Sequence, residues 1–235
     1  MRLILVLVLT VLLPAKGMAA TPETFSSAKR VISKIYSQNP VSFYCNCQYQ
    51  SIKGKLRADL NSCGYIPRKN AKRAARIEWE HIVPAWWLGH QRQCWQNGGR
   101  KNCRKTDPVF RQAEADIMNL VPAIGEINGD RSNYRFGMIA GEARRYGQCD
   151  MEIDFKQRVA EPTADRRGDI ARIYFYMSKK YNIKISSSQQ KLFEAWDKQD
   201  PESDWEKKRN KMIAAITNEP KQRLVYLNSA DKKPD

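Results

Sequence analysis

The sequence predicts a single α+β domain that is rich in helices, and three observations support this class. The chain has 235 residues, of which 42% are hydrophobic and 10% aromatic, so it can bury a core of ordinary size. Apolar residues recur at helical spacing near both ends of the chain, and short strand patterns follow the first helix. No internal repeat and no linker divides residues 21–220, which we assign to one domain.

Residues 1–20 have the pattern of a secretory signal peptide. A basic start precedes an apolar run over residues 3–13, and small residues end the segment at Ala20. The run is too short for a bilayer-spanning helix of about 20 residues, and no later segment is apolar enough to span. We therefore expect an exported protein, periplasmic or secreted, with no membrane partner and a mature chain that begins near Ala20 or Thr21.

The N-terminal part of the mature chain is expected to contain one helix and two strands. Helical spacing predicts an amphipathic helix over Phe25–Gln38, which Asn39-Pro40 ends. Residues Phe43–Tyr49 have a strand pattern. Lys53-Gly54 predicts a turn, and Lys55–Leu60 a partner strand.

The C-terminal part is expected to be helical. Apolar residues keep helical spacing over 170–181, and a short helix is predicted over Ser188–Trp196. Ser203 and Glu206 form a capping box that starts a helix reaching about Thr217. Residues 221–235 are polar with little pattern, as in a disordered tail.

Six cysteines are expected to form three disulfides, because export places them in an oxidising compartment. A metal site is the alternative, but no Cys-x2-Cys pair exists and neither histidine has zinc-finger spacing. Cys94 and Cys103 bracket a short Gly-Gly loop, which favours that bridge. The pairing of the others stays open at this stage; they are Cys45, Cys47, Cys63 and Cys149.

The formal net charge of +16 points to a polyanionic partner. The chain has 41 Lys+Arg against 25 Asp+Glu, and removal of Arg2 and Lys16 with the leader leaves 39 against 25, or +14. Nucleic acid is the first candidate partner, and an acidic membrane surface or polysaccharide the second. Solubility alone is the alternative explanation, although it needs only a modest charge.

A basic run over Pro67–Arg76 directly precedes the segment that carries the candidate chemistry. A run of this kind is often only a solvated face, but here its position favours contact with phosphates. The cations that we expect to bind nucleic acid are Arg68, Lys69, Lys72, Arg73, Arg76, Lys101 and Arg131.

The segment from Glu78 to Arg135 holds the residue types that phosphodiester hydrolysis needs. A neutral imidazole can accept a proton from water, which makes His81 a candidate base. A hard cation such as Mg²⁺ takes oxygen ligands, for which Glu80 and Asn128 are candidates. A guanidinium such as that of Arg100 can clamp a phosphate with two donors.

Each of these signals is weak by itself. A single histidine is more often structural than catalytic, and the run Asn128-Gly129-Asp130 is typical of a turn. Arg100 could simply follow the Gly-Gly loop. The other histidine, His90, lies between Gly89 and Gln91 after an aromatic stretch, and we expect it to be structural.

Residues 78–86, Glu-Trp-Glu-His-Ile-Val-Pro-Ala-Trp, resemble the hallmark of the bacterial endonuclease I family of periplasmic or secreted nucleases. The resemblance runs from about Phe25 to Trp205. It includes further motifs at 43–45, 62–65, 89–95, 98–103, 119–120, 125–131, 146–149 and 171–177.

The resemblance implies a central ββα-metal motif between disulfide-stapled loops. One strand delivers His81, a second strand lies near residues 120–122, and a helix from about Ile124 delivers Asn128. By similarity, His81 is the general base, Glu80 and Asn128 hold one divalent cation, and Arg100 stabilises the phosphate. Mg²⁺ is the expected ion, with Ca²⁺ or Mn²⁺ as alternatives.

The resemblance also implies an endodeoxyribonuclease that acts as a monomer. It is expected to cut double- and single-stranded DNA, and often RNA, with little sequence preference and to leave 5′-phosphate ends. A secreted ribonuclease is one alternative, and an exported nucleic-acid-binding protein without catalysis is another.

One geometric problem concerns Glu80 and His81. Neighbouring side chains on a regular strand point to opposite faces, so either the chain bends near Pro84 or Glu78 shares the ligand role. We keep Glu80 as the expected ligand. Candidates for a supporting role around the site are Glu78, Glu114, Asp116 and Asn119.

The C-terminal part departs from the family pattern. Relatives commonly carry a further pair of cysteines there, one just after a Trp-Glu pair, whereas this chain has Lys207 at that position and no Cys after Cys149. The departure puts the rigidity of the C-terminal region in doubt but leaves the candidate site unchanged.

Overall fold

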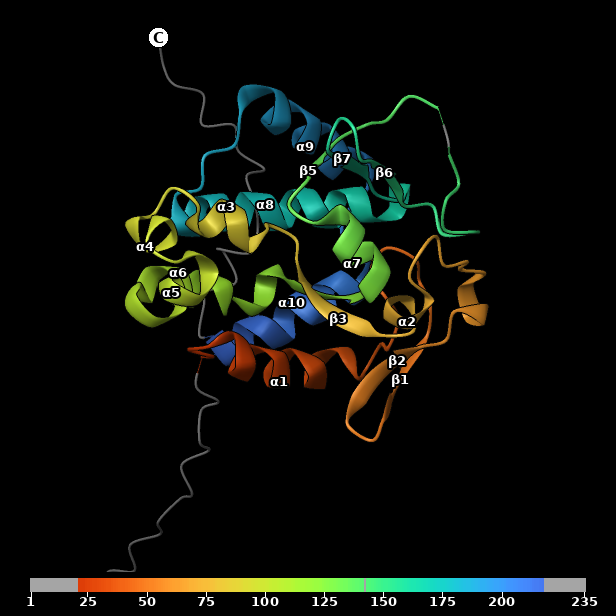
Figure 1. Ribbon diagram of the computed structural model, residues 1–235, viewed down its shortest axis with the longest axis horizontal. Helices are drawn as coiled ribbons and strands as arrows, with labels where there is room; N and C mark the ends of the chain where they lie inside the picture. Colours follow the sequence, from red (N-terminus) through yellow and green to blue (C-terminus); the bar gives the residue numbers. More distant parts are fainter. Residues whose placement is uncertain (1–20, 142, 218–235) are drawn as a thin grey trace, which may run out of the picture.

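A computed structural model describes residues 21–141 and 143–217 of the chain (Figure 1). The predicted signal peptide and the predicted tail over 221–235 lie outside these residues. The longer helices are α1 (Phe25–Tyr36), α8 (Arg167–Tyr181), α9 (Ser187–Gln199) and α10 (Asp204–Thr217). The shorter helices are α2 (Ala71–Ala74), α3 (Ala85–Gly89), α4 (Gln93–Gln96), α5 (Gly99–Thr106), α6 (Pro108–Glu114) and α7 (Gly125–Arg131). Three 3-10 turns are η1 (Asn61–Cys63), η2 (Ile117–Asn119) and η3 (Ala164–Arg166).

The strands of the described residues form three small sheets. In the first, β1 (Tyr49–Ile52) pairs antiparallel with β2 (Lys55–Ala58). In the second, β3 (Ile77–His81) pairs antiparallel with β4 (Leu120–Ile124). In the third, β7 (Val159–Glu161) pairs parallel with β5 (Arg135–Phe136) and antiparallel with β6 (Glu152–Asp154). The predicted helix-rich α+β class is therefore confirmed.

Most of the predicted elements are present. The first helix ends at Tyr36, two residues earlier than predicted, and a Thr24–Ser27 capping box starts it. The predicted strand over Lys55–Leu60 is β2, which ends at Ala58, and the turn before it is confirmed. The three C-terminal helices are α8, α9 and α10, and Ser203 Oγ accepts the backbone N–H of Glu206 as the capping box requires.

The predicted strand over Phe43–Tyr49 is wrong. Residues 43–45 form a turn, and β1 begins only at Tyr49. Asn46 has a positive φ of 54°, and its backbone N–H donates to Ser42 O. This local turn replaces an extended segment, because Cys45 and Cys47 are joined to two different parts of the chain and are not side by side on one strand face.

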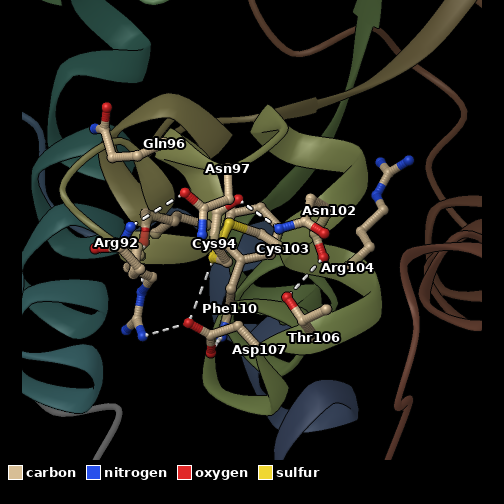
Figure 2. Close-up of a disulfide and its surroundings, with 12 residues drawn as sticks. Arg92, Cys94, Gln96, Asn97, Asn102, Cys103, Arg104, Thr106, Asp107 and Phe110 are labelled. Carbon is tan, nitrogen blue, oxygen red and sulfur yellow. Dashed lines mark hydrogen bonds and ion pairs between the residues drawn. A yellow bond between two sulfur atoms is a disulfide. The ribbon is translucent and has the colours of Figure 1, made fainter.

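All six cysteines are paired, as Cys45–Cys149, Cys47–Cys63 and Cys94–Cys103. The predicted Cys94–Cys103 bridge is confirmed, and Figure 2 shows it between α4 and α5. Asn102 Nδ2 also donates to Cys94 O at 2.8 Å. The bridge and this hydrogen bond fix the start of α5, which carries Arg100.

The core is organised around α8, whose residues from Ile170 to Met177 are all buried. Figure 1 shows α8 crossing the molecule next to α9, while α1 lies at the opposite edge. Rings of Tyr174, Phe193 and Trp196 pack in sequence between α8 and α9. Over the described residues, no helix combines the length and apolar character needed to cross a bilayer.

The C-terminal helix α10 is tied to the core by two buried arginine contacts. Arg172 on α8 donates to both carboxylate oxygens of Glu206, at 2.8 and 2.5 Å. Arg209 on α10 donates to the carbonyl of Met118 at 2.7 Å. Glu206 directly precedes Lys207, so an ion pair anchors the chain at the place where relatives are expected to carry a further cysteine.

Candidate active site

The pair β3–β4 and the helix α7 form the expected strand–strand–helix unit. Residues Ile77 to His81 pair in register with Ile124 to Leu120, which places His81 opposite Leu120. The chain enters α7 directly after β4, and Gly125 N–H donates to Arg76 O at 2.8 Å. In the sequence, helices α3 to α6 lie between β3 and β4, and Figure 1 shows them gathered on one side of the unit.

A cavity of about 530 Å³ lies beside β3. Of the predicted site residues, His81, Arg100 and Asn128 line it together, whereas Glu80 does not. Its lining residues are Phe25, Lys29, Arg73, Ile77, Glu78, Trp79, His81, Pro84, Ala85, Arg100, Asn128, Arg131 and Ser132. Glu78 and His81 lie on alternate faces of β3 and still reach the same cavity, so the cavity follows an edge of the strand.

The hydrogen bonding of His81 suits a general base. Its Nε2 lies 2.8 Å from the carbonyl of Glu114, which can only accept, so Nε2 carries the ring proton. The other ring nitrogen, Nδ1, is then unprotonated and has a lone pair that can accept a proton. Burial and the positive charge of Arg100 lower the pKa of His81 to about 4. The imidazole is therefore neutral at neutral pH and able to accept a proton.

Glu80 is buried, with an exposed fraction of 2%. Its Oε1 accepts hydrogen bonds from Tyr44 Oη at 3.0 Å and from Arg131 Nη1 at 3.1 Å. Its Oε2 is also buried and has no hydrogen-bond partner among the described residues. Burial raises the pKa of Glu80 against the opposing effect of Arg131. An unpartnered buried carboxylate oxygen is costly, and a cation would satisfy it.

Glu78 is the carboxylate that faces the cavity. Its Oε2 accepts from Asn128 Nδ2 at 2.9 Å, and Arg73 donates to both of its oxygens, at 3.0 and 2.8 Å. This hydrogen bond uses the amide nitrogen of Asn128 and leaves its amide oxygen to face elsewhere. Gly125 and Gly129, one turn apart on α7, make room for Arg73: a Cβ on Gly129 would lie 2.0 Å from Arg73 Nη1.

Arg100 is held by Glu114 and still has a donor to spare. Its Nε donates to Glu114 Oε1 at 2.5 Å, and Arg104, one turn later on α5, donates to both oxygens of Glu114. Burial opposes ionisation of Glu114, but the two arginines outweigh it and lower its pKa. Arg100 Nη2 is buried and has no hydrogen-bond partner among the described residues, so it is suited to donate a hydrogen bond to an anionic ligand in the cavity.

The predicted nucleic-acid-binding cations divide into two groups. Arg68 and Arg73 are engaged with Asp130 and Glu78. Lys69, Lys72 and Lys101 are exposed, and Arg76 is exposed but lies 4.0 Å from Glu78 Oε1. Glu126 accepts the backbone N–H groups of Arg68 and Lys69 at 3.1 and 2.7 Å, which fastens the basic run to α7.

Arg131 is almost fully buried and also lines the cavity. It is 1% exposed, and its guanidinium donates to Glu80 Oε1 and to the carbonyls of His81 and Ile82. With these partners Arg131 fixes the end of β3, and its Nε has no hydrogen-bond partner among the described residues.

The two remaining candidates, and His90, have structural contacts. The side chain of Asn119 makes two hydrogen bonds to the backbone of Val83. Its Oδ1 accepts the N–H at 2.7 Å, and its Nδ2 donates to the carbonyl at 2.9 Å. Asp116 is buried and accepts hydrogen bonds from Tyr176 and Tyr181. His90 stacks on Trp86 with ring centroids 3.6 Å apart, in keeping with the structural role expected for it.

Sequence patterns did not identify three residues that the fold brings to the site. Phe25 and Lys29 of α1 line the cavity, and Phe25 stands 4.8 Å from the His81 ring. Arg104 shares Glu114 with Arg100. The i, i+4 spacing of Arg100 and Arg104 on a helix is the one signal that could have indicated Arg104. Phe25 was indistinguishable from a core residue of an amphipathic helix.

The donor set fits a hard cation with few protein ligands. Among the described residues, no group of three or more His, Cys, Asp or Glu side chains gathers as a metal cluster would. Mg²⁺ usually keeps several waters and takes only one or two carboxylates from the protein. Of the two ligands that the resemblance implies, Glu80 has an oxygen without a partner among the described residues, and the hydrogen bond to Glu78 uses the nitrogen of the Asn128 amide.

A strand-borne histidine, a helix-borne asparagine and a cationic cavity are the parts expected of a nuclease, and comparison with known proteins agrees. The family described as Endonuclease I matches residues 18–221. The chain therefore belongs to the endonuclease I family, as the motifs predict, and the predicted class of enzyme, an endonuclease, is confirmed.

The chain is similar to several characterised relatives over most of its length. An "Extracellular deoxyribonuclease" of Aeromonas hydrophila is 50% identical over 216 residues, which cover 92% of this chain and 94% of the relative. A "Periplasmic deoxyribonuclease" of the same organism is 50% identical and covers 88% of each chain. "Endonuclease-1" of Buchnera aphidicola subsp. Acyrthosiphon pisum is 51% identical and covers 83% of this chain and 78% of the relative.

Proposed function

We propose that this protein is an exported, metal-dependent endonuclease that hydrolyses DNA, and also RNA, with little sequence preference and leaves 5′-phosphate ends. The observation that carries the proposal is the hydrogen bond from His81 Nε2 to Glu114 O beside the Arg100 guanidinium. It leaves a neutral base and a phosphate clamp facing one cavity. Export, to the periplasm or the medium, is supported by the leader pattern and by the names of the relatives.

In the proposed reaction, a water attacks the phosphorus while the bond from phosphorus to the 3′ oxygen breaks. His81 Nδ1 accepts the proton of that water. Arg100 donates to the phosphate oxygens as the charge on them grows, because its Nη2 has no other partner among the described residues. Glu114 holds Arg100 in place and, through its carbonyl, fixes the ring of His81.

Glu80 and Asn128 would hold the divalent cation, Mg²⁺ in the first instance. When bound, the cation would neutralise charge on the phosphate and on the departing 3′ oxygen. Glu78 would set the rotation of the Asn128 amide, because it accepts a hydrogen bond from Nδ2. Ca²⁺ and Mn²⁺ would suit the same oxygen donors.

Low sequence preference follows from the kind of contact available. Exposed lysines and arginines of the basic run can grip phosphates, which set affinity and register but carry no base information. Single and double strands and RNA share that backbone charge. We expect the enzyme to act as a monomer.

A plasmid-nicking assay tests the proposal. The purified protein should convert supercoiled plasmid to nicked and linear forms with Mg²⁺, lose activity in EDTA and regain it when Mg²⁺ is restored. His81→Ala should reduce cleavage by at least about 100-fold, the usual contribution of a general base, while DNA binding by fluorescence anisotropy stays near normal.

The outcomes separate the alternatives. Near-normal turnover by His81→Ala would remove His81 as the base. Full activity in EDTA would remove the metal from the mechanism. Tight binding of DNA with no cleavage under any metal would favour a binding protein without catalysis. Cleavage of RNA but not DNA would make the protein a ribonuclease.

A further inference from the structure

Phe25 of α1 is surrounded by positive charge at one side of the cavity. Lys29 Nζ lies 5.0 Å from the centre of its ring, and the Cζ atoms of Arg100 and Arg104 lie at 5.5 and 5.7 Å. The ring itself stands 4.8 Å from that of His81. Three cations from two helices that are distant in sequence thus converge on one aromatic ring beside the candidate base.

The positive charge of this group exceeds the negative charge that balances it. Glu114 is paired with both Arg100 and Arg104. No ion pair joins Lys29 to a carboxylate within residues 21–141 and 143–217, although Lys29 lines the cavity. Three positive charges therefore face one negative charge, which leaves a local surplus of two. Cation–π attraction to Phe25 holds the cations close together but neutralises none of them.

We propose that Lys29 and Arg104, gathered around Phe25, form a second phosphate subsite for the backbone phosphate next to the scissile one. This inference rests on the proposed function, because Arg100 is taken to clamp the scissile phosphate. The ligand is a phosphodiester group of the nucleic-acid strand.

The geometry suits a neighbouring phosphate. Along each strand of a duplex, phosphates recur about every 3.4 Å of helix rise, so a strand bound at Arg100 carries its next phosphate close by. The side chain of Arg104 on α5 is half-exposed, and Figure 2 shows it projecting away from the Cys94–Cys103 bridge. Arg100 and Arg104 lie one turn apart on α5, so one helix would present a cation to each of two successive phosphates.

The test measures how DNA binding depends on salt. Binding is measured in a His81→Asn background, which keeps a planar polar group beside Phe25 while cleavage is suppressed. Lys29→Ala should weaken binding of a short duplex about two- to fivefold, as expected for one exposed ion pair. The slope of log K against log salt concentration should fall by about 0.9, the value for one lost phosphate contact.

Lys34→Ala is the matched control, because Lys34 is an exposed lysine of the same helix that does not line the cavity. Its slope should match the parent. Arg104→Gln should lower the slope as Lys29→Ala does, and Phe25→Leu should weaken binding by spreading the cations. In the active enzyme, Lys29→Ala should raise KM and leave kcat within about twofold, since the contact is made equally before and during reaction.

A neutral methylphosphonate group in the DNA gives the sharper arm. Placed next to the phosphate that is cut, it should weaken binding by the parent protein, weaken binding by Lys29→Ala less, and have no further effect on the double variant Lys29→Ala with Arg104→Gln. An unchanged slope for Lys29→Ala, or an equal fall for Lys34→Ala, would overturn the subsite. Those results leave the plasmid assay untouched, so failure of the subsite and failure of the nuclease proposal are distinguishable.

Discussion

Glu78 and Glu80 lie two residues apart on β3, yet the fold gives them different environments. Glu78 faces the cavity and is engaged by Arg73 and Asn128. Glu80 is buried with Tyr44 and Arg131 and keeps one oxygen without a partner among the described residues. Because Oε2 of Glu80 lacks a hydrogen-bond partner in the part of the chain that the structure describes, we propose Glu80 as the ligand and Glu78 as the residue that orients Asn128.

Metal titration distinguishes the two carboxylates. We expect Glu80→Gln to weaken Mn²⁺ binding by at least about tenfold, because it removes a charged ligand. Glu78→Gln should weaken it less, since its amide can still accept from Asn128. Isothermal titration calorimetry of the two variants measures this. A larger loss for Glu78→Gln would transfer the ligand role to Glu78.

Gly129 is a residue whose lack of a side chain matters directly. A Cβ there would meet Arg73 Nη1 at 2.0 Å and displace the guanidinium from Glu78. Because the far end of a flexible arginine can move aside, we expect Gly129→Ala to cost only up to about 1 kcal/mol of unfolding free energy, the value of one partly exposed ion pair, and to lower kcat about tenfold.

The double variant Gly129→Ala with Arg73→Ala is the matched control for that change. Removing the guanidinium removes the clash, so stability in urea should return towards that of Arg73→Ala alone. Activity should stay low, because nothing then holds Glu78. A Gly129→Ala protein as stable and active as the parent would show that Arg73 can move aside without consequence.

At the scale of elements, the site depends on an insertion between paired strands. β3 carries His81 and β4 leads into α7 with Asn128, while α5 carries Arg100 from the insertion. The Cys94–Cys103 bridge and the Asn102 hydrogen bond fix α5 against α4. Arg100 therefore reaches the cavity from a short helix whose position is set by a disulfide.

Removal of that bridge should affect activity through Arg100. We expect Cys94→Ala with Cys103→Ala to lose about 2 to 3 kcal/mol of stability, the value for a short closed loop, and to lose activity at temperatures where the protein is still folded. Urea denaturation would measure the stability and plasmid nicking the activity. Both would be done at about 20 to 30 °C, on the order of ten degrees below the unfolding temperature. Full activity in the folded double variant would mean that α5 is held by packing alone.

At the scale of the whole molecule, buried charge links the C-terminal helices to the core. Arg172 joins Glu206 of α10 and Asp197 of α9 to α8. Asp169, one turn before Arg172, is also enclosed. Burial, with the nearby charge of Glu206, raises the pKa of Asp169 to about 8.

This shift makes stability depend on pH. Between about pH 4 and pH 8 the folded protein holds a proton on Asp169 that the unfolded chain has released, so the unfolding free energy falls as pH rises through this window. Asp169→Asn carries no charge at any pH. We expect the unfolding free energy of this variant to fall less with pH than that of the parent. At pH 8 the variant should be more stable than the parent by on the order of 1 to 3 kcal/mol.

Thermal unfolding of both proteins at pH 5 and pH 8 measures the effect. The difference between the two proteins should be larger at pH 8 than at pH 5. Parallel changes in melting temperature with pH would mean that Asp169 is ionised in the folded protein and that its arginine neighbours, Arg166 and Arg172, compensate its burial.

The sequence by itself determined the longer helices and the family. Helical periodicity located α1, α8, α9 and α10, because an amphipathic helix needs only local spacing of apolar residues. The motif around His81 identified the family, and the Gly-Gly loop favoured one disulfide. Such local patterns depend on residues that are close in the sequence, so they can be recognised without knowledge of the fold.

Tertiary structure alone decided which side chains share the cavity. The turn at residues 43–45 depends on disulfide partners 104 and 16 positions away in the chain. Arg131 is basic by composition but is buried because its helix turns it inward. Phe25 and Lys29 reach His81 only because α1 packs beside β3. Burial and long-range pairing are properties of the packed chain, and no local spacing encodes them.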